Sequence, residues 1–237
     1  MNNISIVKML KNPGFLYDLN YLFYLRFNTQ RCLDCFESEA KKEENSKYFS
    51  DILKHFSKIS DDLYVFYHAI GNGRCFITTF YLDQYKNQFS TNFDFNFFKN
   101  ELSDTERLVK NLIRFYLCEL SEEELESAFS SNLKLFGYIK ASDYTDEEKS
   151  RLYEFFINPA PYIQTLIYEL IEKEIALSAY YKDNYEKLIE ASNNITFESL
   201  SENLKGIDDL SFLKDKDQKL YVTFCLLNQH CLNLYLV

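Results

Sequence analysis

The residues whose types and spacing are best suited to chemistry are Cys32 and Cys35, which form the only Cys-x-x-Cys pair in the chain. Two thiolates at this spacing can share a zinc ion, but a structural zinc site needs two further ligands. His230 and Cys231, or Cys75, could supply them. A redox dithiol is expected beside a βαβ pattern, and the sequence shows none. We therefore interpret both cysteines as thiols that pack in a helix interface, with metal or redox chemistry as the alternative, and we expect no cofactor.

The histidines and paired carboxylates give no catalytic pattern. Three histidines stand at positions 55, 68 and 230, and none belongs to a recognisable motif. The adjacent acids Asp61 and Asp62 favour the dipole of a helix start and need no active site to explain them. We therefore predict that the protein is not an enzyme. A structure that placed His55 or His68 against two carboxylates in a cleft would favour catalysis instead.

A candidate binding site lies on a long helix predicted between Ile163 and Leu188. Its apolar residues recur in one stripe at 100° per residue, and Glu174 projects into the middle of that stripe. A bend in the helix or a nearby partner would explain this position, because buried acids are normally paired. The alternative is a polar anchor in a ligand pocket or in a helix–helix interface. The candidate ligand or interface residues are Glu174, Tyr181 and Tyr185.

This helix follows a proline elbow at residues 158–161. Asn158 and Ala160 precede prolines and are poor helix interiors, whereas Pro161 suits the first position of the next helix. Glu169 and Lys173 are spaced as an ion pair on a solvated face. About thirty residues of helix is long for a globular domain. We expect such a helix to span the domain or to form a dimer interface.

The other segments predict more helices. The apolar run from Phe15 to Phe27 indicates a buried helix with Asp18 among its few polar exceptions, and residues 38–47 indicate a charged, flexible connection. Capping-box patterns, in which Ser or Thr is followed three residues later by Glu, open three later helices. They begin at Ser103, Ser121 and Thr145.

The predicted fold class is mainly α: a multi-helix bundle with one long central helix and a small β element. The last twenty residues indicate a terminal hairpin turning near Asn228 and Gln229, and residues 2–10 fit either a short strand or a helix start. One helical domain over residues 1–237 is expected, with a loose subdivision into 1–100 and 101–237. An apolar strand at the terminus would leave an edge that needs a partner. We therefore expect the sequence to end before a C-terminal DNA-binding domain.

The charge balance limits the partners. With 36 acidic and 26 basic residues the net charge is −10, and no stripe of Lys and Arg is present to contact phosphates. Direct binding of nucleic acid or of an anionic membrane surface is therefore disfavoured. The sequence has no run of eighteen apolar residues and no signal peptide, so we expect a cytoplasmic protein.

Three segments resemble a group of bacterial regulators. They are Asn-Pro-Gly-Phe-Leu-Tyr-Asp-Leu at residues 12–19, Phe-x-x-Glu-Leu-Ser-Asp-Thr-Glu at residues 98–106, and the Asn-Pro-x-Pro elbow that leads into the long helix. In this order they resemble the N-terminal helical region of ArsR-like winged-helix transcriptional regulators of low-GC Gram-positive bacteria. No winged helix precedes Val237.

The resemblance implies a non-enzymatic sensing or dimerising region, present as a homodimer, that responds to a small-molecule effector and reaches DNA only through a segment outside this chain. The metal-binding cysteines of metal-sensing ArsR proteins lie on or beside the winged helix, so the resemblance assigns no metal to Cys32 or Cys35. The residues themselves leave a second hypothesis, a stand-alone helical protein–protein interaction module or adaptor.

Overall fold

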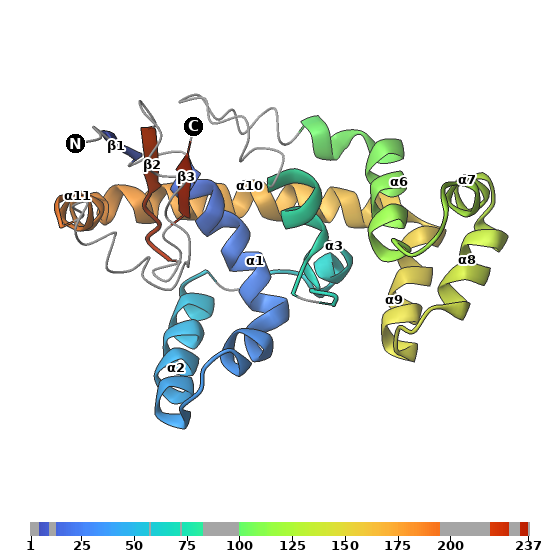
Figure 1. Cartoon of the computed structure of the whole chain (residues 1–237), viewed down its shortest axis with the longest axis horizontal. Coiled ribbons are helices and arrows are strands. Elements are labelled where there is room, and N and C mark those ends of the chain that lie inside the picture. The colour runs from blue at the N-terminus through green and yellow to red at the C-terminus, as the bar shows by residue number, and fades with distance from the viewer. Residues whose placement is uncertain are drawn as a thin grey trace. The chain divides into compact units, whose positions relative to one another are not determined.

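The computed structural model describes residues 5–9, 13–56, 58–71, 73–82, 100–194, 219–227 and 233–236. Helices dominate these residues, which confirms the predicted mainly α fold (Figure 1). The chain forms two compact units: unit 1 comprises Met1–Tyr21 and Glu174–Val237, and unit 2 comprises Leu22–Lys173. None of the described helices is both long enough and apolar enough to cross a membrane.

The described helices follow one another with short connections over most of unit 2. They are α1 (Pro13–Asp34), α2 (Glu39–His55), the 3-10 turn η1 (Asp61–Leu63), α3 (Tyr64–Tyr67), the π-helical turn η2 (Thr78–Leu82), α6 (Thr105–Tyr116), α7 (Glu122–Ser130), α8 (Asn132–Ala141), α9 (Asp146–Ile157), α10 (Pro159–Asp183) and α11 (Tyr185–Asn193).

Unit 1 contains a three-stranded sheet in the order β1-β2-β3, built from Ser5–Met9, Lys219–Thr223 and Asn233–Leu236. The first strand pairs parallel to β2, with Ser5 opposite Lys219, and β2 pairs antiparallel to β3, with Leu220 opposite Leu236. The sequence analysis placed a terminal hairpin at β2 and β3 and a strand or helix start at β1. The predicted turn at Asn228 and Gln229 lies outside the described residues.

The core of unit 2 is aromatic. The rings of Phe23 and Tyr67 stack at 4.7 Å, and those of Phe66 and Phe155 meet edge to face at 5.5 Å. All four side chains are fully buried. Large rings that bury this much apolar surface favour folding strongly. These contacts therefore fix α3 between α1 and α9.

The long predicted helix is two helices. α10 begins at Pro159 and not at Pro161, and both prolines fit because the first N–H groups of a helix have no helical partner. It ends at Asp183, and the next residue, Asn184, donates from its backbone N–H and its side-chain amide to the carbonyl of Tyr180, at 3.1 and 2.9 Å. An Asn side chain competes with the helix for backbone partners. The chain therefore restarts as α11, with Tyr185 as its first residue.

Two further expectations are wrong. Residues 38–47 belong largely to α2, because the Ser38 hydroxyl accepts from the Lys41 N–H and caps a helix where a flexible connection was expected. Glu169 and Lys173 do pair, at 3.1 Å, but both are buried, with exposed fractions of 8% and 7%. Spacing along a helix shows that two residues can meet, but it does not show which face a neighbouring segment covers.

The capping predictions hold at two of three helices. Ser121 and Thr145 form complete capping boxes with Glu124 and Glu148. At α6 the cap is Asp104, one residue after the predicted Ser103, and its carboxylate accepts from the N–H of Arg107 at 3.1 Å. Both residue types are good caps, so the local pattern alone left the choice open by one position.

Candidate functional site

A pocket of about 780 Å³ lies in unit 2, where α6 and α8 end. Its walls come from three segments that are far apart in sequence: residues 70–74, residues 116–120 after α6, and residues 138–144 at the end of α8. A cavity of this size can hold a drug-sized organic molecule. Its charged and tyrosine lining residues are Arg74, Glu119, Asp143, Tyr116, Tyr138 and Tyr144.

The helix ends set the polarity of this pocket. α6 closes with the N–H of Leu117 donating to the carbonyl of Ile113, and α8 closes at Ser142, whose N–H and hydroxyl both donate to the carbonyl of Ile139. The last carbonyls of a helix carry partial negative charge. Two such ends therefore meet the pocket.

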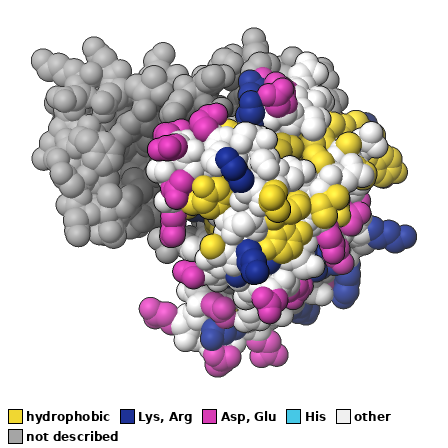
Figure 2. Space-filling view, turned by 90° about the vertical axis from the view of Figure 1, so that its right-hand side faces the viewer, with side chains coloured by type: hydrophobic (Ala, Val, Ile, Leu, Met, Phe, Trp, Pro, Cys, Tyr) yellow, Lys and Arg dark blue, Asp and Glu magenta, His cyan; other side chains and the backbone are white. Residues whose placement is uncertain are grey.

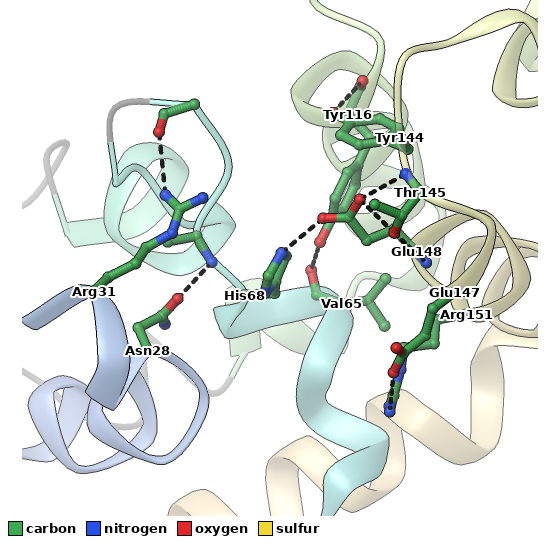
Figure 3. Close-up of polar contacts among 12 residues, drawn as sticks. Asn28, Arg31, Val65, His68, Tyr116, Tyr144, Thr145, Glu147, Glu148 and Arg151 are labelled. Atoms are coloured by element: carbon green, nitrogen blue, oxygen red, sulfur yellow. Dashed lines mark hydrogen bonds and ion pairs between the residues drawn. The ribbon is translucent and has the colours of Figure 1, made fainter. Parts of the chain in front are cut away.

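Two tyrosines hold the wall nearest α9. The Tyr116 hydroxyl donates to the carbonyl of Val65 at 2.6 Å, and the Tyr144 hydroxyl donates to the carbonyl of Tyr116 at 2.8 Å (Figure 3). Their rings meet edge to face at 5.8 Å. Burial raises the pKa of both phenols above the ordinary range, so both stay neutral donors. The chain of bonds thereby fixes the loop before α9 against α6 and α3.

Beside these tyrosines, His68 and Glu148 form a bond of 2.9 Å between Nε2 and Oε1. The other carboxylate oxygen of Glu148 accepts from the backbone N–H and from the hydroxyl of Thr145, both at 2.8 Å. Figure 3 shows Glu148 lying between His68 and Thr145. One carboxylate therefore closes the capping box of α9 and also ties that helix to the residue after α3.

The surroundings of this pair shift both pKa values. Burial lowers the pKa of His68 against the opposing effect of Glu148. For Glu148, burial raises the pKa, but the bonds from Thr145 and His68 outweigh it and the net pKa is lowered. The ring of Tyr64 stacks on His68 at 4.2 Å, and the Arg151 guanidinium lies 4.4 Å from the Tyr64 ring centroid. Among the described residues, the carboxylate that bonds to His68 is that of Glu148.

Asn28 positions this histidine from α1. Its side-chain amide donates to the carbonyls of Tyr24 and Tyr67, and its side-chain oxygen accepts from the N–H of Ala69. The backbone of Asn28 leaves helical geometry, with φ −130° and ψ 21°. A buried amide with its oxygen and nitrogen both bonded locks the two neighbours of His68 in place.

Cys32 and Cys35 lie at the end of α1 and just after it. Cys32 is half-buried near the end of α1, where burial and the neighbouring Cys35 raise the pKa of its thiol to about 11. Such a thiol is a weak nucleophile at neutral pH. Across the described part of the chain, no group of three or more His, Cys, Asp or Glu side chains is placed to hold a metal. His230 and Cys231 lie outside the described residues.

The three residues predicted for a ligand or interface lie in unit 1 and are not among the residues that line this pocket. Glu174 is half-buried on α10. Tyr185 is half-buried at the start of α11. Tyr181 donates its hydroxyl to the Asp18 carboxylate at 2.7 Å. The structure therefore brings Tyr181 to a polar partner and does not bring the three together.

Asp18 is the residue that sequence reasoning passed over. It is fully buried, and one of its carboxylate oxygens accepts from the Tyr181 hydroxyl and from the backbone N–H groups of Leu226 and Leu227, at 2.6 and 3.0 Å. Burial and the charge of Asp18 raise the pKa of Tyr181. The available signal was a lone acid in the apolar run from Phe15 to Phe27. This cluster ties the chain after β2 to α1 and α10 and is structural.

Comparisons with protein-family models, with curated proteins and with solved structures find no match for this chain.

Proposed function

We propose that this chain is the non-enzymatic sensing and dimerising region of a bacterial transcriptional regulator, with a small-molecule effector in the pocket between the ends of α6 and α8. The observation that carries the proposal is the pocket of about 780 Å³, whose wall includes the residue next to the capping box of α9. DNA would be contacted by a segment outside this chain, since the net charge of −10 opposes phosphate binding.

The bonds beside the pocket supply a route from effector to fold. Tyr144 lines the pocket and is followed directly by Thr145, which bonds to Glu148, which in turn bonds to His68. An effector that binds one position of this loop more tightly than another would shift the position of α9 relative to α3. The effector can shift the equilibrium between the two loop positions by at most the difference in its binding free energy for them.

Dimerisation has a candidate surface in the hairpin of α8 and α9. The rings of Phe136 and Tyr153 meet at 5.3 Å, and Leu133 and Ile157 lie one turn further from the connecting loop, 83% and 65% exposed. Figure 2 shows hydrophobic side chains gathered on the face of the molecule that carries these helices. Exposed aliphatic side chains on neighbouring helices are typical of an interaction surface.

The same surface supports the second candidate function, a stand-alone helical interaction module. Sedimentation of the purified chain separates the two. For a dimerising region we expect a dimer that the double substitution Leu133→Glu and Ile157→Glu converts to monomer, while the control Lys134→Glu on the same helix leaves it intact. A wild-type chain that stays monomeric at high concentration would leave only the interaction module.

The sensing role is tested by titrating the chain into three dyes of different charge, cationic rhodamine 6G, neutral Nile red and anionic fluorescein, with fluorescence anisotropy as the signal. We expect at least one dye to bind, and Ala141→Trp, which fills the pocket mouth, to abolish its binding. Ala40→Trp, an exposed Ala on α2, is the matched control. Binding that is equal in wild type and in Ala141→Trp would refute the pocket as the effector site.

A further inference from the structure

We propose that the effector of this pocket is an organic cation with a flat apolar body. The inference rests on the proposed sensing function and adds the chemical class of the ligand. Three features of the lining carry it: the balance of charge, the tyrosine rings, and the apolar surface between them.

The charged side chains of the lining are two acids and one base, and a second base, Arg31, donates to the carbonyl of the lining residue Gly71 at 3.1 Å. Glu119 and Asp143 are exposed acids on the turns that follow α6 and α8, and Arg74 is the one basic residue among the described lining residues. The C-terminal ends of both helices add partial negative charge at the same place. Field lines concentrate in a cleft with low-dielectric walls, so these sources attract a cation more strongly than they would on an open surface.

Three tyrosines, Tyr116, Tyr138 and Tyr144, are among the residues that line the pocket. The hydroxyls of Tyr116 and Tyr144 are already bonded to backbone carbonyls, so these side chains offer the ligand ring surface and not a hydroxyl donor. Tyr138 adds a third, half-buried ring. The face of an aromatic ring is negative and attracts cations, which raises affinity about two- to thirty-fold over a neutral molecule of the same shape.

Much of the remaining lining is apolar. Ile70, Leu117 and Leu120 contribute aliphatic surface, and no group of three His, Cys, Asp or Glu side chains in the described structure is placed to hold a metal. A ligand with a positive charge on an apolar body can contact both the acidic residues and the aliphatic residues of the lining. An aromatic or aliphatic amine of drug size is the ligand class that fits.

The test compares rhodamine 6G with fluorescein, which share a flat xanthene body and differ in charge. Protein is titrated into each dye at physiological salt, and anisotropy gives the dissociation constants. We expect rhodamine 6G to bind about ten-fold or more tightly than fluorescein. Glu119→Gln and Asp143→Asn should each weaken rhodamine binding about three-fold, and Arg74→Ala should strengthen it by a similar factor.

A control separates the pocket from the general acidity of the chain. Glu123→Gln removes an exposed charge from α7, outside the pocket lining, and should leave the rhodamine dissociation constant within about two-fold of wild type. Tyr138→Leu, which keeps the apolar volume but removes a ring, should weaken rhodamine binding and not Nile red binding.

The outcomes divide cleanly. Tighter binding of fluorescein or Nile red than of rhodamine 6G, blocked by Ala141→Trp, would overturn the cation assignment and leave the sensing function standing. Equal weakening by Glu123→Gln and Glu119→Gln would also overturn it, because the attraction would then be non-specific. If no dye binds, both the cation assignment and the proposed sensing function fall.

Discussion

Replacing Asp18 by Asn probes the buried node of unit 1. The substitution keeps the size of the side chain and removes its charge, so three donors now compete for one neutral amide oxygen. Those donors are the Tyr181 hydroxyl and the N–H groups of Leu226 and Leu227. We expect unit 1 to lose stability and the chain after β2 to detach from α1 more often.

The magnitude follows from the bond types. A hydrogen bond to a charged group contributes about 1.5–3 kcal/mol and a neutral one about 0.5–1.5 kcal/mol, so three bonds lose about 3 kcal/mol in total. For a chain of this size that lowers Tm by about 6–12 °C. Tyr181→Phe removes one bond and keeps the ring contact with Phe15, whose centroid lies 5.3 Å away. It should cost about 1–2 kcal/mol.

The assay combines urea unfolding with amide hydrogen exchange. Exchange at Leu226 and Leu227 reports the two bonds directly, and it should accelerate strongly in Asp18→Asn but only slightly in Tyr181→Phe. Asp183→Asn, an exposed acid at the end of α10, is the matched control and should change neither measurement. The two single variants and the double variant form a cycle whose coupling energy should reach about 1 kcal/mol.

The reasoning would be refuted if the amides of Leu226 and Leu227 kept their wild-type protection in Asp18→Asn and the free energy of unfolding fell by less than about 0.5 kcal/mol. That result would show that the carboxylate does not hold the chain after β2. A coupling energy of zero would refute the part that concerns Tyr181 alone.

Three other perturbations have defined outcomes. Burial lowers the pKa of His68 below its ordinary 6.5, so the unfolded chain binds the proton more readily than the folded chain. The free energy of unfolding, measured with urea, should therefore decrease as the pH falls through and below 6.5. This pH dependence should be weaker in His68→Gln. Lys173→Met leaves the buried Glu169 carboxylate without its partner and should cost about 3–5 kcal/mol in urea unfolding, part of which is recovered when Glu169→Gln is added. Gly14→Ala would drive a methyl group into a backbone carbonyl just after β2 and should destabilise the fold by about 1–3 kcal/mol. The methyl group of Gly137→Ala meets open space, and this variant should raise Tm because a glycine inside a helix costs about 1 kcal/mol. A lower Tm for Gly137→Ala would contradict this.

The sequence predicted correctly the helix ends that depend only on residues a few positions apart. The capping boxes at Ser121 and Thr145 were correct because a hydroxyl and a carboxylate three positions apart satisfy each other without help from the rest of the chain. The same reasoning placed the cap of α6 one residue early and overlooked Ser38, because several polar residues in a row offer more than one cap.

The candidate site was less predictable. The pocket forms because residues 70–74, 116–120 and 138–144, which are far apart in the sequence, meet in space. Glu174 was chosen from its angle on an ideal helix. That angle does not account for the break at Asn184 or for what covers each face.

The sequence by itself determined the helical character of this protein, its acidity and the starts of α7 and α9, since periodicity, charge and capping act over a few residues. Only the tertiary structure decided that Asp18 would gather donors from segments more than 160 positions away, that His68 would face Glu148 across 80 positions, and that two helix ends would enclose a pocket. Such contacts arise when the burial of apolar surface brings distant segments together, and the polar groups carried with them must then find partners wherever that burial places them.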